Sequence, residues 1–248
     1  MDSVALLAAA VSMTPAYRLN LPSLAEVATG GYLPMASVVK PMSAEDLYEW
    51  CVRNGQPDVN SSWASAWPAA AALANLLARE PDLVRGRSVV ELGAGLGVAG
   101  LSAAQAGASS VTLVDREPLA LHCAMSTAEC CELQGEDEST PIVKAVAADW
   151  AAVAEGLRVD CVLATECLYD PSDVGSLVEC VARLLGGNGT LVLNDPAKGR
   201  AVGCRAAAQT ALLAAGTTNV ERGAASRGPI GAGVVSEPLI LLRAEFKS

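Results

Sequence analysis

The stretch at residues 89–100 constrains the fold more than any other part of this chain. It reads Val-Val-Glu-Leu-Gly-Ala-Gly-Leu-Gly-Val-Ala-Gly, an apolar run that ends in an acid and is followed by closely spaced glycines. A helix-compatible run follows at 101–106. This order predicts a strand, a tight turn and the beginning of a helix. Glycine suits the turn because a side chain there would stop a nucleotide-like ligand from lying against the backbone.

The rest of the chain continues the alternation of strands and helices. Strands are expected at 88–92, 110–114, 142–147, 159–165, 190–194, 217–222 and 237–246, and helices at 44–53, 68–79, 97–107, 117–132, 172–185 and 201–214. Apolar strands alternating with helices predict a mostly parallel sheet that is covered on both faces. We therefore expect an α/β fold with a doubly wound, Rossmann-like sheet over residues 61–248. Residues 1–60 are expected to form an N-terminal extension, with one or two short strands before residue 42.

Composition limits the classes of partner and compartment. The chain has 248 residues, of which 52% are hydrophobic, enough for one large α/β domain. Its net charge of −10 argues against a nucleic acid partner and permits a basic protein or an amine as substrate. No apolar run approaches the length of a membrane span.

The cysteines and the single histidine predict neither a metal site nor disulfides. The eight cysteines form no C-x-x-C pair, and His122 is the only histidine. A reducing compartment is the simplest interpretation, and we expect a cytoplasmic protein. An organellar stroma or matrix is the alternative, because residues 3–25 contain one Arg and no acid, as in a transit peptide.

Glu91 is the residue from which we infer the ligand. The spacing of Gly95, Gly97 and Gly100 also fits the dinucleotide fingerprint, so the glycines alone do not decide. A pyrophosphate at a helix N-terminus favours positive potential, and the carboxylate of Glu91 would repel it. The same carboxylate suits a ligand that carries an ammonium and a sulfonium group. The loop therefore predicts S-adenosyl-L-methionine rather than NAD.

The ends of the later strands supply further candidates, because ligands of doubly wound sheets bind beyond the carboxyl ends of the strands. Asp115 lies twenty positions after Gly95 and can accept hydrogen bonds from both ribose hydroxyls. Asp149 can accept from the adenine amino group, and Trp150 can stack on the ring. The alternatives are a surface acid that opens a helix for Asp115, and a helix cap with a core tryptophan for the other pair.

Residues 63–68, Trp-Ala-Ser-Ala-Trp-Pro, and the glycine loop together carry a family resemblance. Taken alone, Trp63 and Trp67 have core packing as an equal alternative to a ligand role. Over about residues 60–200 the chain resembles the seven-β-strand methyltransferases, and more narrowly their protein-lysine methyltransferase branch. The resemblance implies a seven-stranded sheet with an antiparallel last strand, and a turn at 195–196. It places at the cofactor site Trp67, Gly93, Ala94, Gly95, Asp115, Trp150 and Thr165, to which the residue-level argument adds Glu91, Gly97, Arg116 and Asp149.

The chain departs from the family pattern at two places. The family's N-A-x-x-N run in the second helix reads Thr-Ala-Glu-Cys-Cys at 127–131, and its D-x-x-Y run reads Glu-Cys-Leu-Tyr at 166–169. Methyl transfer from a sulfonium is an in-line displacement that depends mainly on holding a neutral lone pair near the methyl carbon. We expect Glu166 to orient or partly neutralise the incoming amine and Tyr169 to shape its channel. A helix-capping role without substrate contact is the alternative for Glu166.

The predicted function is methylation of a lysine side chain in a protein. A methyltransferase acting on small amines, an NAD-dependent oxidoreductase, and an interaction protein that has lost catalysis are the alternatives. A nucleic-acid amino-methyltransferase fits less well, because its [DN]-P-P-[YF] run is absent after the strand at 159–165. Neither a nucleic acid nor a membrane is expected as a partner, and the sequence leaves the oligomeric state open.

Overall fold

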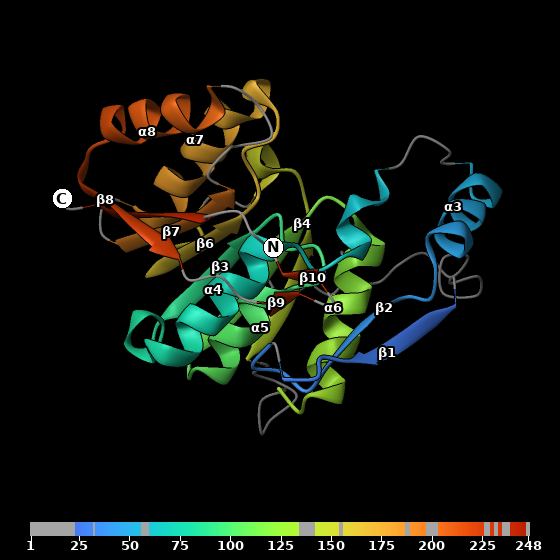
Figure 1. Ribbon diagram of the computed structural model, residues 1–248. Coiled ribbons are helices and arrows are strands. Elements are labelled where there is room, and N and C mark those ends of the chain that lie inside the picture. Colours follow the sequence, from blue (N-terminus) through green and yellow to red (C-terminus); the bar gives the residue numbers. More distant parts are fainter. Residues whose placement is uncertain are drawn as a thin grey trace.

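A twisted β-sheet between two layers of helices forms the centre of the protein (Figure 1). The computed structural model describes residues 23–31, 33–55, 60–133, 142–153, 156–186, 189–196, 203–225, 229–230, 233–234 and 239–246. Within these residues the sheet has seven strands, in the order β5-β4-β3-β6-β7-β11-β8. The strands are β3 (Ser88–Leu92), β4 (Ser110–Asp115), β5 (Val143–Ala147), β6 (Cys161–Thr165), β7 (Gly189–Pro196), β8 (Thr217–Ala225) and β11 (Leu239–Phe246).

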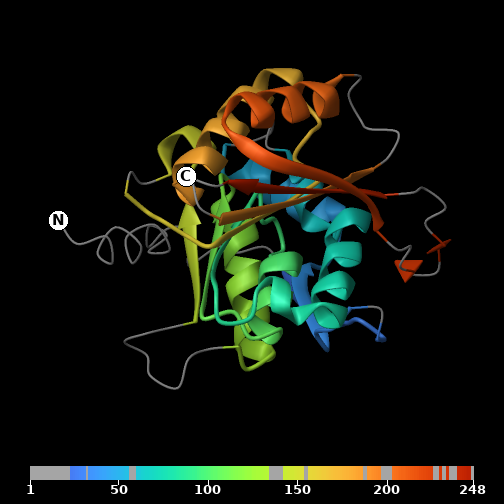
Figure 2. The ribbon, with the colours of Figure 1, turned by 90° about the vertical axis from the view of Figure 1, so that its left-hand side faces the viewer.

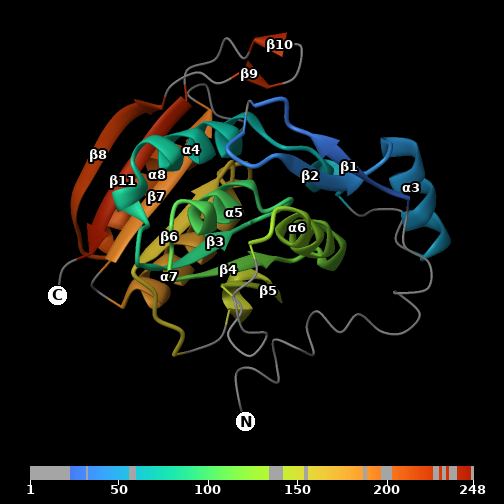
Figure 3. The ribbon, with the colours of Figure 1, turned by 90° about the horizontal axis from the view of Figure 1, so that it is seen from below.

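The direction of the strands agrees with the expected topology. Strands β3, β4, β5, β6 and β7 pair in parallel, whereas β11 runs antiparallel to both β7 and β8. Figure 3 shows this order from β8 at one edge to β5 at the other. The chain builds outward from β3 to β5 and then returns to lay β6 on the other side of β3. The switch point therefore lies between β3 and β6, where doubly wound sheets bind their ligands.

The helices divide between the two faces of the sheet. They are α3 (Ala44–Arg53), α4 (Pro68–Arg79), α5 (Val98–Gln105), α6 (Pro118–Cys130), α7 (Val174–Leu185) and α8 (Cys204–Ala214), with short 3-10 turns η1 (Ser61–Ala64), η2 (Pro81–Leu83), η3 (Trp150–Ala152) and η4 (Pro171–Asp173). Figure 2 shows α7 and α8, in orange, on the face of the sheet opposite α4, in teal. The helices expected from the sequence are present, with ends that differ by at most three residues.

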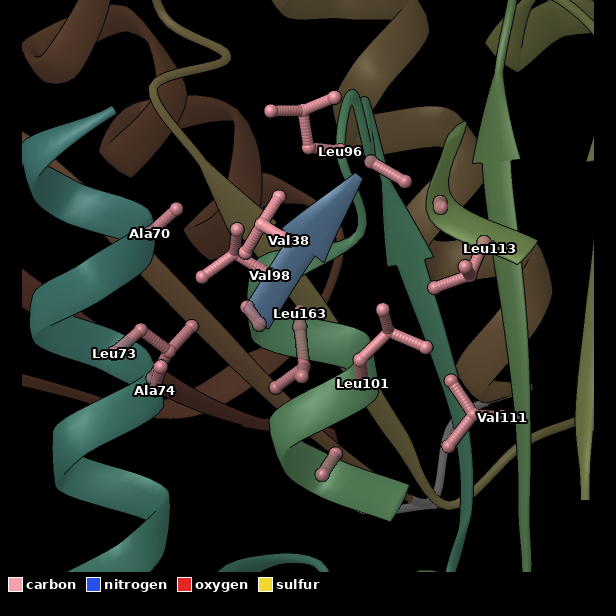
Figure 4. Packing of buried hydrophobic residues seen from close by; sticks show 14 of the residues in the cluster. Val38, Ala70, Leu73, Ala74, Leu96, Val98, Leu101, Val111, Leu113 and Leu163 are labelled. Carbon is pink, nitrogen blue, oxygen red and sulfur yellow. The ribbon is translucent and has the colours of Figure 1, made fainter. Parts of the chain in front are cut away.

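Each face of the sheet has its own apolar core, as a period of two along the strands requires. Val89 packs with α4, α5 and α6, and its neighbour Val90 packs with α7 and α8. Figure 4 shows the first core at close range, with Leu73 of α4, Leu101 of α5 and Leu113 of β4 turned toward one another. Coverage on both faces explains why the central strand β6, Cys-Val-Leu-Ala-Thr, is almost entirely apolar and fully buried.

An N-terminal unit precedes the sheet and packs against α6. It consists of α3 and a hairpin of β1 (Leu24–Ala28) and β2 (Ser37–Pro41), which pair antiparallel. The backbone N–H of Val39 in β2 donates to Thr127 Oγ1 in α6 over 2.8 Å. Trp50 of α3 is 3% exposed and belongs to the same core as α4, α5 and α6. The N-terminal region thus contains the short strands that the sequence predicts, and it shares the main core.

One expectation about the chain's course is wrong. The sequence predicts a turn at Asp195 and Pro196, but β7 continues through both residues. They pair with Ile240 and Leu239 of the antiparallel strand β11, which extends β7 beyond the end of its parallel partner β6.

Two further short strands, β9 (Pro229–Ile230) and β10 (Gly233–Val234), form a separate hairpin. Across the described ranges, no helix combines the length and apolar character needed to cross a membrane.

Candidate active site

A cleft of about 520 Å³ opens beyond the carboxyl ends of β3, β4 and β6. A volume of this size suits a single small-molecule ligand, for which pockets of roughly 300–1,000 Å³ are usual. The wall is formed by Asn60, Ser62, Trp63, Ser65, Ala66, Trp67, Ala70, Gly93, Ala94, Gly95, Leu96, Val98, Asp115, Arg116, Glu117, Ala148, Asp149, Trp150, Ala151, Thr165, Glu166, Cys167, Tyr169, Asp173 and Ser176. Segments far apart in the sequence therefore meet here, as the strand-end argument predicts.

The glycine loop folds back onto the tips of β4 and β6. Gly93 has φ +65, and a Cβ at this position would lie 2.9 Å from Cys167 Sγ. Gly97 has φ +72 and begins α5 as its N-cap, where a Cβ would lie 2.9 Å from the methyl group of Ala124. Glycine is therefore required at both positions by backbone conformation and by close packing. Gly93, Ala94 and Gly95 line the cleft, whereas Gly97 lies behind it against α6.

Glu91 does not reach the cleft, in contrast to the expectation. It is 1% exposed, and its Oε2 accepts a hydrogen bond from the N–H of Gly100 over 2.8 Å. Residues 89 and 91 share one face of β3, so the Glu91 side chain lies with Val89 on the side that α5 covers. Gly97 has no side chain to cap α5, and Glu91 supplies the missing acceptor at its first turn.

The charge of Glu91 also differs from the expectation. Burial raises its pKa to about 8, against the opposing effect of the N–H groups of Gly100 and Ala99. The group is therefore largely protonated at neutral pH and cannot repel a phosphate as a full charge would. The discrimination that was inferred from Glu91 must come from other residues.

Asp115 ties the end of β4 to the glycine loop. Its Oδ2 accepts from the N–H of Gly95 over 2.7 Å, and its Oδ1 accepts from the N–H of Glu117 over 2.9 Å. Burial raises the pKa of this carboxyl, and both N–H groups act in the opposite direction. Arg116 follows in sequence and also lines the cleft. The carboxylate is fixed in direction by two backbone donors while it forms part of the wall.

Three tryptophans lie on the wall, and each is held differently. Trp67 is the N-cap residue of α4, and its Nε1–H donates to the carbonyl of Ser62 over 2.9 Å. Trp63 is 7% exposed and packs beside Gly95. Trp150 begins η3, packs partly into the core of α7 and α8, and approaches Gly93. The sequence left the role of Trp63 open, and its spacing of four from Trp67 was the available signal.

The loop after β6 forms the opposite side of the cleft. Thr165 is 8% exposed at the strand end, and Tyr169 is 39% exposed. Glu166 lies between them, 7% exposed, with a positive φ of 53. Its Oε1 accepts from the N–H of Ala69 in the first turn of α4 over 3.0 Å. The capping interaction considered as the alternative for Glu166 is therefore present in the structure.

Cys167 is a cleft residue that the sequence analysis did not select. Its Sγ–H contacts the carbonyls of Leu92 and Thr165 over 3.3 and 3.4 Å, and burial raises its pKa. The thiol therefore stays protonated and packs the floor of the glycine loop. Asp173 and Ser176 enter the wall from η4 and α7. No pattern in the sequence marks these two residues, since only the folding of the chain after β6 brings them here.

Negative charge dominates the cleft wall. Among the described lining residues, the acids are Asp115, Glu117, Asp149, Glu166 and Asp173, and the sole base is Arg116. Such a lining favours a cationic ligand over an anionic one. Among the described residues, no group of three or more His, Cys, Asp or Glu side chains is arranged to hold a metal ion.

The sequence model of the lysine methyltransferase family matches residues 53–201, which is more than half of the chain. The chain belongs to the lysine methyltransferase family. The matched region contains all the described lining residues of the cleft, including those of α4, the glycine loop and the loop after β6. The N-terminal unit lies almost entirely before it.

Curated relatives agree with this membership in the lysine methyltransferase family. The chain is 28% identical over 174 residues to the electron transfer flavoprotein beta subunit lysine methyltransferase of Rattus norvegicus, covering 70% of this chain and 65% of the relative. It is 29% identical over 126 residues to a histone-arginine methyltransferase of Rattus norvegicus, covering 49% of this chain and 53% of that protein. The chain thus spans less than two thirds of the length of either relative.

Solved structures show the same fold. The N-methyltransferase NodS from Bradyrhizobium japonicum, in complex with S-adenosyl-L-homocysteine, superposes with a TM-score of 0.55 at 18% identity. The match covers 81% of this chain and 98% of that chain. The expected Rossmann-like methyltransferase fold, with its antiparallel strand, is confirmed.

Proposed function

We propose that this protein transfers a methyl group from S-adenosyl-L-methionine to a lysine side chain of a protein. The observation that carries the proposal is the match of residues 53–201 to the lysine methyltransferase family, over a region that contains the cleft at the switch point. The relative named as acting on the electron transfer flavoprotein beta subunit supports a protein acceptor. For this chain, a protein lysine as the methyl acceptor is what we propose.

The residues of the cleft fit this cofactor. Gly93 and Gly95 leave the loop without side chains where a ligand can lie against the backbone. Asp115 uses two acceptor positions for backbone N–H groups, and a carboxylate offers about four, so it retains capacity for ribose hydroxyls. Trp150 offers a ring face for adenine, with Asp149 beside it. These residues would hold the nucleoside part of the cofactor.

The acidic wall replaces Glu91 as the reason for preferring a sulfonium donor to NAD. A diphosphate in this cleft would face the carboxylates of Glu117, Asp149 and Asp173, with Arg116 as the one described cation on the wall. A ligand with an ammonium and a sulfonium group would be attracted by the same carboxylates. The preference for S-adenosyl-L-methionine over NAD therefore depends on these acids and not on Glu91.

The chemistry asks the protein mainly for positioning. The bound cofactor supplies an electrophilic methyl group, and the lysine amine must arrive neutral and in line with it. Thr165, Glu166 and Tyr169 form the side of the cleft that we assign to the incoming amine. Tyr169 is 39% exposed, so its ring can line the entrance while its neighbours stay buried. Exclusion of water by the tryptophans would favour the neutral amine.

The cysteines and the net charge of the chain indicate its compartment and the charge of its acceptor. All eight cysteines are free thiols, which suits a reducing compartment, either the cytoplasm or the interior of an organelle. The net charge of −10 favours a basic protein surface as acceptor and disfavours a nucleic acid.

A transfer assay with tritium-labelled S-adenosylmethionine tests the proposal. The acceptors are recombinant electron transfer flavoprotein beta subunit, mixed core histones and, separately, free lysine and spermidine. We expect label in a protein acceptor and methyl-lysine after hydrolysis. Methyl-arginine would reassign the acceptor side chain, and label confined to the free amines would make the enzyme a small-molecule methyltransferase. Calorimetric binding of NADH without binding of S-adenosylmethionine would overturn the proposal altogether.

A further inference from the structure

Both backbone polar groups of Ala69, at the beginning of α4, are held by side chains from the sheet. The N–H of Ala69 donates to Glu166 Oε1 over 3.0 Å, and the carbonyl of Ala69 accepts from Asn194 Nδ2 over 2.8 Å. Glu166 follows β6 and Asn194 lies in β7, so two neighbouring strands grip one residue of the helix. We call these two side chains and Ala69 the α4 clamp.

The residues of the α4 clamp are also hydrogen-bonded to each other and buried from solvent. The N–H of Glu166 donates to the carbonyl of Asn194 over 2.9 Å. Ala69 and Asn194 are fully buried and Glu166 is 7% exposed. Hydrogen bonds in such a place face little competition from solvent. The clamp is therefore a rigid connection between the sheet and the first turn of α4.

The backbone of Glu166 adopts a conformation that is unfavourable for a residue with a long side chain. Its φ of 53 lies in the left-handed region, which an L residue with a long side chain rarely adopts. Glycine would adopt this conformation without strain but could not cap α4. The N-cap residue of the helix, Trp67, makes no side-chain capping bond itself. Pro68 occupies the next position, where it is tolerated because its missing N–H is not needed.

The clamp acts on the cleft through the residues on either side of Ala69. Trp67 and Ala70 both line the cleft, and Trp67 is anchored at its other end by its bond to Ser62. If Ala69 shifts, the first turn of α4 and the indole of Trp67 shift with it. The function that the carboxyl of Glu166 serves here needs an oxygen acceptor for an N–H, not a group that exchanges a proton.

We propose that Glu166 and Asn194 are positioning residues, which hold Ala69 so that Trp67 and Ala70 form the cofactor-binding wall. Glu166 then acts through α4 and does not take the proton of the acceptor amine. The inference rests on the proposed function for its catalytic readout, and on the contacts of Ala69 for its structural one. It assigns Asn194, which lies outside the cleft wall, a role in the activity.

Two substitutions at Glu166 separate positioning from proton transfer. Glu166→Gln keeps an oxygen that can accept from Ala69 but cannot act as a base, whereas Glu166→Ala removes both properties. Leaving a buried N–H or C=O group without its hydrogen-bond partner costs about tenfold in an equilibrium constant. We therefore expect Glu166→Ala and Asn194→Ala to raise the Kd of S-adenosylhomocysteine by about tenfold, and Glu166→Gln to recover most of that loss in Kd and turnover. Asp82→Asn, an exposed acid in η2, is the charge-matched control.

Hydrogen exchange gives a second readout that needs neither cofactor nor substrate. The amides at the start of α4 should exchange faster in Glu166→Ala than in Glu166→Gln or in the Asp82→Asn control, measured by mass spectrometry on the peptide over residues 66–72. If wild-type protein binds no S-adenosyl compound, the proposed function fails while this comparison still decides about the clamp. Equal loss of kcat in Glu166→Gln and Glu166→Ala, with cofactor Kd and exchange as in wild type, would overturn the inference and make Glu166 a proton-transfer group.

Discussion

Two glutamates at strand ends serve in this protein as caps for helices to which they do not belong. Glu91 follows two apolar residues of β3 and caps α5, and Glu166 follows β6 and caps α4. The N-cap residues of these helices, Gly97 and Trp67, make no side-chain capping bond. An acid beyond a strand is therefore ambiguous in the sequence, because a ligand contact and a cap both call for a carboxyl at that point.

Glu91 makes the stability of the protein depend on pH in a defined direction. Burial raises its pKa from 4.5 to about 8, so the folded protein keeps a proton that the unfolded chain releases. The stability contributed by this group is fully present below about pH 4.5 and is lost as the pH rises through 8. We expect the free energy of unfolding of the wild type, relative to Glu91→Gln, to fall between these limits.

Urea unfolding of both proteins at about pH 5, 7 and 9 measures this difference. The comparison removes the contributions of the other acids, because they are the same in the two proteins. A difference in unfolding free energy that does not change with pH would show that Glu91 is ionised in the folded protein.

At the scale of elements, α5 depends on close contact with the sheet. It has eight residues and no side-chain cap of its own, and residues 98–103 are all buried. Gly100 allows this approach, since a Cβ there would lie 2.4 Å from Leu113 Cδ2 and 2.7 Å from Glu91 Oε2. The position of α5, which follows the glycine loop, thus depends on the absence of a side chain at Gly100 and on the buried carboxyl of Glu91.

Gly100→Ala is expected to destabilise the fold by about 1–3 kcal/mol, because the added methyl group must push α5 from β4 and from its cap. Chemical denaturation measures the change. Gly175→Ala is the matched control, since Gly175 is exposed in α7 and nothing lies within 4 Å of its added Cβ. That substitution should be neutral or stabilise by up to about 1 kcal/mol. Equal effects of the two substitutions would contradict the packing argument.

At the scale of the whole molecule, α6 connects the central sheet with the N-terminal unit. Two residues at which the chain departs from its family face the hairpin, one helical turn apart. Thr127 Oγ1 accepts from the N–H of Val39, and Cys131 Sγ lies 3.7 Å from the carbonyl of Ser37. Thr127 and Cys131, at the end of α6, thus hold β2 in place. The unit that they hold shares the core of α4, α5 and α6.

Thr127→Val tests this connection. The substitution leaves the buried N–H of Val39 without its acceptor, and we expect a loss of about 1–3 kcal/mol in unfolding free energy. Thr210→Val is the control, because Thr210 makes the same type of bond to a carbonyl four residues earlier, but on the exposed side of α8. Its effect should stay within about 0.5 kcal/mol. A loss of similar size in both variants would show that the bond across to β2 contributes nothing.

The order of strands and helices could be predicted from the sequence because it follows from local patterns. The strand at 88–92 and the helices at 44–53 and 68–79 have the expected ends. Ser43 caps the first of these helices by accepting from the N–H of Asp46, a contact over three residues. Apolar period, capping residues and glycine turns act over a few residues, so they can be read from a single sequence. The end of β7 could not, since a distant antiparallel strand extends it.

The sequence by itself determined which strand ends would carry the site. Gly93, Gly95, Asp115, Trp150 and Thr165 meet in one cleft because parallel strands bring their carboxyl ends to one edge.

Only the tertiary structure decided which way each side chain at that edge points. The side chain of Glu91 turns under α5 and that of Glu166 turns to α4. Asp173 and Ser176 enter the cleft wall from η4 and α7, whose placement no local sequence pattern predicts. The physical reason is that a buried carboxyl is placed by the nearest unsatisfied N–H groups. Those groups belong to helices that pack against the strand only after the chain has folded.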